Sequence, residues 1–473
     1  MNIPSSVKKL LYTLERYGYE GYVVGGAVRD FLMEKNPHDW DIATNARPEQ
    51  VKELFSKVID TGIKHGTVTV MDGGEGYEIT TYRSDGDYSD GRHPDEVVFV
   101  GSIEEDLSRR DFTINAMAMD VRGNIVDPFG GMEDIQKGMI RCVGSPDDRF
   151  SEDALRMIRA VRFESKLGFS LEENTKQAIS RNTDKLSSVS MERIRDEFTK
   201  ILVSDHPKVG FVSAYETGIT AKVFPEFDRM MECEQNTPYH FTNVGMHSLI
   251  GVEACPKNEV LRWAMLLHDT GKPDMKQKKN GRDTFYSHEA RSKEIADQVL
   301  KRFRFSTKDR MEIVSLVANH GLTMSKPKKV RRFAAKYGES FLNELYEIKK
   351  ADAKASNPDY YDRILQPHTA FIEQALGYIH DGTAIRPSDL NINGNELKEY
   401  GFSGKTIGVF MRDAYDECLG SPNLNTNDLL RQRAKKLSER MDIKKSCEDA
   451  QSLAEQKGLV TEVDDDGFTP CVE

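Results

Sequence analysis

Two aspartates near the start of the chain have the spacing of a metal-binding pair. Asp39 and Asp41 flank Trp40 and follow a turn that begins with Gly25 and Gly26. Alternate side chains of a strand point to the same side, so a strand here would let both carboxylates bind one divalent cation. The glycines allow backbone N–H groups to approach a phosphate closely. Each half alone is common in turns or on surfaces, but together they predict metal-dependent transfer from a nucleoside triphosphate.

A second charged cluster consists of Arg109, Arg110 and Asp111. The two guanidinium groups can neutralise phosphate, and the carboxylate can accept hydrogen bonds from a ribose. For an isolated Arg-Arg-Asp, however, a surface salt-bridge cluster is the better explanation. The functional interpretation therefore depends on what surrounds the cluster.

A helix with one charged face is predicted at residues 152–167, with Ser151 as its N-cap. Its charged side chains recur every three residues and so share a face: Asp153, Arg156, Arg159 and Arg162. An aligned aspartate and arginine match the donor and acceptor of the Watson–Crick edge of C or A. G and U present the reverse pattern and would leave polar groups unpaired. This face predicts selection of C and A, with an ordinary solvated helix face as the alternative.

Histidines and acidic side chains recur further along the chain. They are His247, His268, Asp269, His288, His320 and Asp352, with Lys272 close to the adjacent His-Asp pair. An isolated His-Asp is more often a satisfied polar pair than a metal site. If these side chains do converge, imidazole and carboxylate together suit Mn²⁺, Ni²⁺, Co²⁺ or Fe²⁺.

The elements that must position these residues differ between the two parts of the chain. Strand signals occur at 22–24, 41–44, 66–71 and 77–82, with helix signals at 10–17 and 49–58. Beyond about residue 150 helical periodicity dominates, at 152–167, 192–202, 260–267, 287–301 and 309–319. The predicted fold class is multidomain, with a small α/β head followed by a long all-α body.

The composition is that of a globular protein. Of the 473 residues, 30% are charged and 38% hydrophobic, and no apolar run approaches the ~20 residues of a membrane span. The N-terminus lacks the apolar core of a signal peptide, and the six cysteines form no Cys-x-x-Cys pair. We therefore expect a reduced, cytoplasmic protein with no membrane partner.

The net charge of −11 neither supports nor excludes a nucleic-acid partner. Residues 446–473 hold eight acids and one lysine and are typical of a disordered acidic tail, so the rest of the chain is only mildly acidic. Local patches matter more than the total. The most basic stretch, 325–333, has the charge to contact an RNA backbone, although a solvated helix start explains it nearly as well.

Taken in order, these motifs occur in one enzyme family. The chain resembles the class II, bacterial-type CCA-adding tRNA nucleotidyltransferases, which share a superfamily with bacterial poly(A) polymerases. The resemblance is carried by residues 25–41, 77–83 with the loop to Pro94, 109–118, 152–163 and 192–200. It departs from the family at residues 33–36, Met-Glu-Lys-Asn, where Leu-Gly-Arg is common.

The resemblance implies a polymerase-β-like head in which Asp39 and Asp41 hold Mg²⁺, with Glu78 as a third carboxylate beside the metals. The loop from Asp85 to Pro94 matches an element linked to the switch from C to A addition. The implied nucleotide-binding residues are Gly26, Arg29, Arg110, Asp153, Arg156, Arg159 and Arg162. The implied domains are a head at 1–140, a neck with the nucleobase template at 141–205, a body with an HD domain at 206–345, a C-terminal helical domain at 346–445 and the acidic tail at 446–473.

The histidine and aspartate set resembles the HD phosphohydrolase family. This resemblance implies His247, His268, Asp269 and Asp352 as ligands of a divalent metal. It leaves His288 and His320 to extend the site to a second ion or to bind phosphate, and Lys272 to orient the substrate. Some bacterial CCA-adding enzymes carry such a domain with phosphatase and cyclic phosphodiesterase activity.

The implied function is addition of the 3′-terminal CCA to tRNA from CTP and ATP, by two-metal chemistry without a nucleic-acid template and with release of pyrophosphate. The nearest alternative is a poly(A) polymerase or an A-only enzyme, against which residues 60–69 argue by their likeness to the CCA-adding type. An HD phosphohydrolase whose head only binds nucleotide is a second alternative. A non-catalytic RNA-binding module is a third, disfavoured by the carboxylates. The sequence leaves the oligomeric state open.

Overall fold

The computed structural model describes residues 3–37, 39–85 and 97–440. The chain forms two compact units. Unit 1 is Met1–Gly321 with Glu347–Leu365, and unit 2 is Leu322–Tyr346 with Gln366–Glu473. The loop up to Pro94 and the acidic tail at 446–473 lie outside the described residues. None of the described helices is long and apolar enough to cross a membrane.

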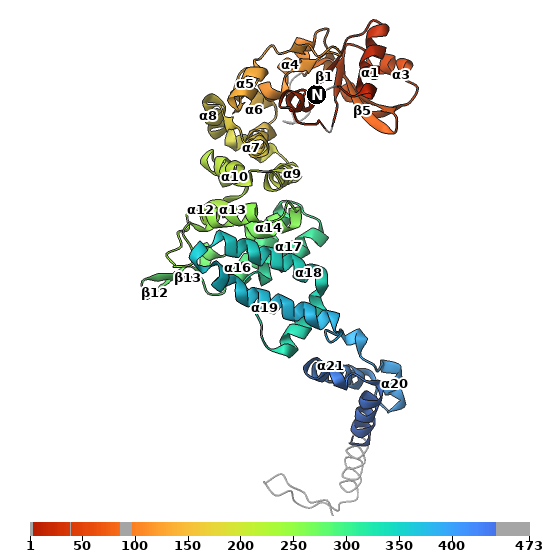
Figure 1. Cartoon of the computed structure of the whole chain (residues 1–473), viewed down its shortest axis with the longest axis vertical. Coiled ribbons are helices and arrows are strands. Elements are labelled where there is room, and N and C mark those ends of the chain that lie inside the picture. Colours follow the sequence, from red (N-terminus) through yellow and green to blue (C-terminus); the bar gives the residue numbers. More distant parts are fainter. Residues whose placement is uncertain (1–2, 38, 86–96, 441–473) are drawn as a thin grey trace, which may run out of the picture. The chain divides into compact units, whose positions relative to one another are not determined.

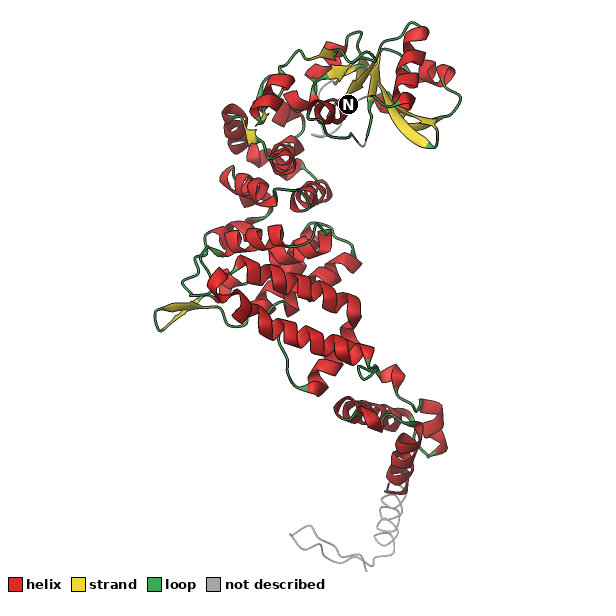
Figure 2. Ribbon diagram, in the orientation of Figure 1, coloured by secondary structure: helices red, strands yellow, loops and turns green. Residues whose placement is uncertain are grey.

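The head of unit 1 is built on a seven-stranded sheet in the order β3-β4-β5-β2-β1-β8-β9 (Figure 2). Strands β2 and β5 run parallel, whereas the other neighbouring pairs of this sheet are antiparallel. The strands are β1 Gly21–Val24, β2 Ile42–Thr44, β3 Val58–Gly62, β4 Thr67–Asp72, β5 Glu75–Thr81, β8 Ala118–Met119 and β9 Ile125–Val126. A separate pair joins β6 Arg83–Asp85 to β7 Val97–Phe99.

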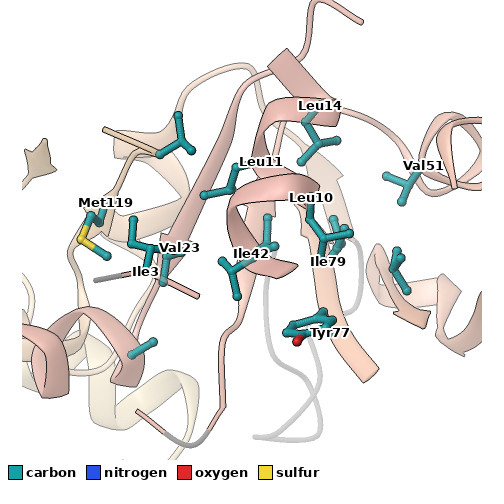
Figure 3. Close-up of a cluster of buried hydrophobic side chains, with 14 of the residues drawn as sticks. Ile3, Leu10, Leu11, Leu14, Val23, Ile42, Val51, Tyr77, Ile79 and Met119 are labelled. Atoms are coloured by element: carbon teal, nitrogen blue, oxygen red, sulfur yellow. The ribbon is translucent and has the colours of Figure 1, made fainter. Parts of the chain in front are cut away.

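Five α-helices accompany the strands of the head: α1 Ser5–Arg16, α2 Gly26–Leu32, α3 Pro48–Leu54, α4 Ile103–Ser108 and α5 Gly131–Lys137. Helix α1 buries Leu10, Leu11 and Leu14, which recur at helical spacing. In Figure 3 these leucines lie with Val23 and Ile42 of the two central strands in one apolar cluster. The cluster holds β1 and β2 side by side.

The pairing of β1 with β2 brings the glycine turn next to the aspartates. The strands are antiparallel, Val23 lies opposite Ile42, and the Val24 N–H donates to the Asp41 carbonyl at 2.9 Å. Gly25 therefore leaves β1 where Asp41 enters β2. The predicted strand at 41–44 begins one residue later than expected, so both aspartates lie in the segment that leads into the strand. The helix predicted at 49–58 ends at Leu54, because Val58 already belongs to β3.

The neck corrects the helix predicted at residues 152–167. Two helices stand there, α6 Pro146–Glu152 and α7 Leu155–Leu167, separated at Asp153 by an extended backbone (φ −144°, ψ 104°). Helix α6 starts early because the Ser145 hydroxyl caps it by accepting from the Asp148 N–H, and proline is favoured in the first turn. Ser151 is consequently inside α6 and is not an N-cap. The Asp153 carboxylate lies before α7 and accepts from the N–H of Leu155, the first residue of that helix, at 3.0 Å.

Helices make up most of the remaining structure, as predicted (Figure 1). They are α8 Glu173–Asn182, α9 Met191–Leu202, α10 Pro207–Glu216, α11 Ile219–Val223, α12 Pro225–Met231, α13 Val244–Ala254, α14 Glu259–Leu267, α15 Lys272–Met275, α16 His288–Arg302, α17 Thr307–Asn319, α18 Pro327–Ala355, α19 Tyr361–His380, α20 Gly394–Glu399 and α21 Gly404–Gly420. The fold class is thus confirmed. Two small sheets were not predicted: β10 Met139–Ile140 with β11 Ser170–Leu171, and the hairpin of β12 Gln277–Lys279 and β13 Arg282–Thr284.

The expected domain boundary between residues 345 and 346 falls inside α18. The backbone of this helix is non-helical at Gly338 (φ 78°, ψ 176°), and its last residues belong to unit 1. In unit 2, residues 388–435 form a helical region with its own apolar core, which includes Leu397, Phe402 and Phe410. In the basic stretch, Lys328 and Arg332 both pair with Asp416 of α21. Part of the positive charge predicted for RNA contact is therefore neutralised within unit 2.

Candidate functional site

The glycine turn after β1 requires glycine at its first position. Gly25 has φ 70° and ψ −132°, and a Cβ there would lie 3.0 Å from Nη1 of Arg110. L-residues rarely adopt that backbone conformation. The Gly25 N–H donates to the Met117 carbonyl at 3.4 Å, so it is not free to bind phosphate as expected. Gly26 begins α2, and first-turn amides lack a partner within their own helix.

Three carboxylates, Asp39, Asp41 and Glu78, line one pocket of about 660 Å³. The surrounding protein restricts hydration of the Asp41 carboxyl and so raises its pKa, Glu78 and Asp39 raise it further, and Arg110 opposes them. A cluster of like charges that is only partly neutralised suits a cation. In the helical body, groups of three histidine or aspartate side chains place their ligand atoms within 4.8 Å of one another, whereas the described residues of the head form no such group. The three carboxylates of the head are therefore more widely spaced.

A neighbouring pocket of about 670 Å³ gathers every residue predicted to bind nucleotide. Seven arginines and one lysine line this pocket, against only four aspartates. Asp39 and Asp41 line both pockets, so the carboxylates stand where the two meet. The residues of the basic pocket are Gly25, Gly26, Arg29, Asp39, Asp41, Arg109, Arg110, Asp111, Asn115, Asp153, Leu155, Arg156, Arg159, Arg162, Phe163, Lys166 and Arg193.

The expected pair between Asp153 and Arg156 is not formed. Asp153 instead accepts from Arg193 Nη2 at 2.7 Å. Arg156 pairs with Glu152 and donates to the Arg109 carbonyl at 3.1 Å. The cause is the break between α6 and α7, which takes Asp153 out of the helix. Both side chains still face the pocket, but the sequence prediction missed Arg193.

Asp111 positions an arginine of the pocket and is not free to accept from a ribose. Its Oδ2 accepts from Arg159 Nε at 2.9 Å and from Nη2 at 2.6 Å. Its Oδ1 accepts from the Phe112 N–H and from Asn115. Burial alone would raise the pKa of Asp111, but Arg159 outweighs burial and brings it to about 2. The carboxylate is therefore charged at neutral pH and holds Arg159 in place.

Phe163 supports two other predicted arginines. The guanidinium carbon of Arg162 lies 4.3 Å and that of Arg29 5.4 Å from the centre of the Phe163 ring. Arg29 is buried and donates to Asn115 Oδ1 at 2.6 Å. The sequence analysis missed Phe163, Asn115 and Lys166. The spacing of Lys166, four residues after Arg162 on the same helix, was the available signal for it.

The six predicted metal ligands of the body lie on five helices or directly after them, namely α13, α14, α16, α17 and α18, and they converge on one place. Each of two histidines lies close to an aspartate oxygen. His247 Nε2 lies 2.9 Å from Asp352 Oδ1, and His268 Nε2 lies 3.1 Å from Asp269 Oδ2. The other oxygen of Asp269, Oδ1, lies 3.2 Å from His288 Nε2 and 3.7 Å from His320 Nε2. The structure therefore brings all six residues together, and Asp269 stands between two groups of ligands.

The imidazoles are oriented as metal ligands are. The Nδ1 atoms of four histidines lie 2.7 to 3.2 Å from backbone carbonyls, namely His247 to Ala355, His268 to Met265, His288 to Phe285 and His320 to Val317. A carbonyl accepts only, so Nδ1 carries the hydrogen in the neutral ring and the Nε2 lone pair points into the site. This is the usual arrangement of metal-bound histidine.

Buried polar atoms test whether a metal fits here. His268 Nε2 and both carboxylate oxygens of Asp269 are buried and receive no hydrogen bond of good geometry from the described residues. Burial raises the pKa of Asp269, yet His268 and Lys272 lower it well below its usual range, so the carboxylate is charged. A cation would balance the charge of this buried carboxylate and accept the Nε2 lone pairs around it. The residues therefore fit a divalent metal.

Two residues near this site were missed by the sequence analysis. The ring of His240 packs edge-on against His247 at 4.7 Å, and its Nε2 lies 3.5 Å from Lys272 Nζ. Lys349, which is buried, donates to the carbonyls of Asn319 and His320. Their sequence surroundings offered little signal, since neither has a characteristic neighbour.

Comparisons with known proteins agree with this arrangement. Three family models match in chain order: the poly A polymerase head domain at residues 21–141, a probable RNA and SrmB-binding site of polymerase A at 168–231, and the HD domain at 240–357. The match to the HD domain includes Asp352, which the expected boundary at 345 had separated from the other ligands.

Curated relatives are CCA-adding enzymes. That of Lactobacillus helveticus is 55% identical over 229 residues, 48% of this chain and 57% of the relative. That of Geobacillus kaustophilus is 53% identical over 212 residues, 45% of this chain and 52% of the relative. The matched part of the chain thus spans little more than half the length of these relatives.

Solved structures cover more of the chain. The CCA-adding enzyme of Bacillus stearothermophilus in complex with CTP is 29% identical, with a TM-score of 0.66 over 92% of this chain and 98% of that one. The Thermotoga maritima CCA-adding enzyme complexed with tRNA_CCA, 20% identical with a TM-score of 0.53 over 92% and 97%, shows the same fold. This chain is therefore similar to bacterial CCA-adding enzymes, and it carries matches to the poly A polymerase head domain and to the HD domain.

Proposed function

We propose that this protein adds the 3′-terminal CCA to tRNA, taking C from CTP and A from ATP and releasing pyrophosphate. The observation that carries the proposal is the meeting of two pockets at Asp39 and Asp41, one lined by arginines and one by Glu78. A triphosphate has its charge complement in the first pocket, and the second offers space for the end of an acceptor chain. Since the acceptor is tRNA, we propose a cytoplasmic location.

Asp39 and Asp41, with Glu78 beside them, would hold Mg²⁺. When bound, Mg²⁺ lowers the pKa of the tRNA 3′-hydroxyl and stabilises the pyrophosphate that leaves. The protein itself positions the reactants. Arg110 lines the arginine-lined pocket beside Asp41 and pairs through Nη2 with Asp106 at 3.2 Å, and we assign it to the triphosphate. The Gly26 amide at the start of α2 presents a further donor.

Choice of base is assigned to Asp153 and Arg156. At present Arg193 and Glu152 pair with them, and we propose that C or A replaces these partners with hydrogen bonds of its Watson–Crick edge. G or U would leave the aspartate facing an acceptor and the arginine facing a donor, which costs roughly 1 to 3 kcal/mol for each unpaired buried group. The stacked Arg162 and the anchored Arg159 then clamp the triphosphate beside this edge.

The experiment that tests the proposal supplies tRNA transcripts that end before the CCA, after C, or after CC, with CTP, ATP or both. We expect C, C and A to be added in order and addition to stop after A. Asp41→Asn should abolish incorporation, whereas Asp60→Asn, an exposed aspartate of β3 that pairs with Lys52, should leave it intact. Unlimited A addition would instead show a poly(A) polymerase, and A addition only after CC an A-adding enzyme.

A second candidate function, metal-dependent phosphate ester hydrolysis, is favoured by the two ligand groups around Asp269. Its Oδ2 faces His247 and His268, with Asp352 beside them, and its Oδ1 faces His288 and His320. We propose that these residues would hold two divalent ions of the Mn²⁺, Ni²⁺, Co²⁺ or Fe²⁺ type, with Asp269 belonging to both ligand groups. Metal in such a pair activates water and neutralises phosphate charge.

Elemental analysis of the purified protein tests this centre. We expect about two transition-metal ions per chain. Removal of one imidazole by His320→Ala should reduce the count to about one, and Asp269→Ala should remove both. The matched control is His380→Ala, an exposed histidine of unit 2, which should change nothing. A wild-type protein without transition metal after purification under metal supplementation would refute a loaded site.

A further inference from the structure

A basic hairpin next to the metal centre remains without a role in either function. Strands β12 and β13 are joined by Asn280 (φ 51°) and Gly281 (φ 75°), the two-residue turn with positive φ that gives a tight hairpin. Figure 1 shows the hairpin extending away from the helices around it. Residues 276–282 carry four basic side chains and no acidic one.

Three of these basic side chains are open to solvent. Lys278, Lys279 and Arg282 are exposed, and no described carboxylate forms an ion pair with them. The fourth, Lys276, pairs with Asp283 at 3.1 Å. In a chain with a net charge of −11, this hairpin presents positive charge that the fold leaves available for an anion.

The hairpin is fastened to the metal centre. Buried Asp283 accepts from the Asn236 N–H at 2.9 Å, and its own N–H donates to the Asn236 carbonyl. The next residue back, Gln235, accepts from Lys272 Nζ at 2.8 Å, and Lys272 Nζ lies 2.6 Å from Asp269 Oδ2. Strand β13 is therefore connected to the Asp269 carboxylate through Asp283, Asn236, Gln235 and Lys272. Along the chain, His288 follows the end of β13 by four residues.

Exposed aromatic rings accompany this positive charge. Tyr286, two residues before His288, is 63% exposed, and Phe241, next to His240, is 58% exposed. Lys279 Nζ lies 5.8 Å from the centre of the Tyr286 ring. Thirteen large hydrophobic side chains are exposed among the described residues, and these two lie next to His240 and near His288 along the chain. Basic side chains interleaved with aromatic rings are the usual means of binding single-stranded nucleic acid, through phosphate contacts and base stacking.

We propose that the HD site acts on a phosphate at the end of a single-stranded RNA segment, which the hairpin and its neighbouring aromatic rings hold. Lys278, Lys279 and Arg282 contact backbone phosphates, and Tyr286 and Phe241 stack on bases. The inference rests on the proposed hydrolytic function of the centre and names its substrate class. A free nucleotide occupies only the metal site, whereas an RNA strand that is bound there also extends to the hairpin. The β-strands of the hairpin rise by ~3.3 Å per residue.

The reaction assigned to a terminal phosphomonoester is simple hydrolysis. The oxygen of water bonds to phosphorus, the ester P–O bond breaks, and a proton of that water ends on the ribose oxygen, giving inorganic phosphate and a hydroxyl. No reactant other than water is needed.

The test compares two phosphate donors on the full-length, metal-loaded protein: a six-nucleotide RNA with a 3′-phosphate and the mononucleotide 3′-AMP. The double variant Lys278→Ala/Lys279→Ala is expected to raise KM for the hexamer about tenfold and to leave its kcat, and both constants for 3′-AMP, unchanged. The slope of log KM against log salt for the hexamer should fall by about one for each lysine removed. Lys293→Ala/Lys308→Ala, two exposed lysines of α16 and α17, is the matched control and should equal wild type.

A second measurement separates this inference from the hydrolytic proposal. If wild type hydrolyses neither donor, the hydrolytic function fails, while fluorescence anisotropy of a labelled hexamer still shows whether the hairpin binds RNA. Equal KM values for the hexamer in the hairpin and control variants would overturn the inference. So would a hairpin variant that is impaired only in CTP incorporation into tRNA, since the hairpin would then serve the head.

Discussion

Replacing Asp111 by asparagine tests how the pocket keeps its arginines in place. Asp111 is 8% exposed, and Arg159 donates two hydrogen bonds to it. The pKa of its carboxyl is about 2, against an ordinary 3.8. Because one pKa unit corresponds to about 1.4 kcal/mol, the charged form stabilises the folded state by about 2 kcal/mol at neutral pH. We expect Asp111→Asn to lower the free energy of unfolding of the head by about this amount.

The pH dependence follows from the sign of the shift. The folded state holds the charged form more tightly than the unfolded chain does, so the stabilisation is complete above pH 3.8 and disappears as the pH falls through about 2. The variant and the wild type should therefore differ by a constant amount between pH 5 and 8. A difference that grew across that range would assign the effect to another group.

The assay is urea unfolding followed by tryptophan fluorescence. The sequence contains two tryptophans: Trp40 packs against the core of the head, and Trp263 is buried in the body. A Trp263→Phe background leaves Trp40 as a reporter of the head. In the same background KM for CTP should rise about tenfold, the equivalent of one lost charge-assisted contact of roughly 1.4 kcal/mol, because Arg159 loses its anchor.

Asp134→Asn is the matched control. Asp134 is also buried and pairs with an arginine, Arg141 at 2.8 Å, but it does not line the basic pocket. It should destabilise the head while KM for CTP stays at the wild-type value. If Asp111→Asn unfolds at the wild-type urea concentration and keeps the wild-type KM, the argument from the Asp111–Arg159 pair is wrong.

Three further predictions follow from the same structure. Gly25→Ala should cost about 1 to 3 kcal/mol of stability and reduce nucleotide incorporation in a primer-extension assay, because its Cβ meets Arg110; Gly123→Ala, also at positive φ but in open space, should reduce stability alone. Lys349→Met should lower the metal count by elemental analysis, because the buried amine no longer donates to the Asn319 and His320 carbonyls; an unchanged count would show that His320 is placed without it. Removing metal with EDTA should lower the melting temperature of the body, with Trp263 as reporter in a Trp40→Phe background, because an ion that binds only the folded state stabilises it; equal melting curves would contradict a structural metal.

The sequence alone determined the features that are local along the chain. Hydrophobic periodicity located α9, α14, α16 and α17 within two residues, because a helix buries one side of a 3.6-residue repeat, but it gave no bounds for the other helices from α8 to α21. Motif spacing likewise singled out the carboxylates at 39 and 41 and the predicted ligands from His247 to Asp352, because metal and phosphate chemistry restricts residue types. Where a local signal was overlooked, as with Ser145 and Pro146 at the start of α6, the predicted helix at 152–167 was wrong.

Tertiary structure decided which of those residues meet, since partners distant in sequence are selected by packing of the whole chain. Asp153 pairs with Arg193, 40 residues away, and not with its neighbour Arg156. His247 meets Asp352 across 105 residues, which a linear domain boundary at 345 had separated. Asp269 turns one oxygen to each of two histidine pairs, a property of side-chain orientation that no spacing encodes. Only the packed helices, by placing Nδ1 of His247, His268, His288 and His320 on backbone carbonyls, brought these histidines into one candidate metal centre.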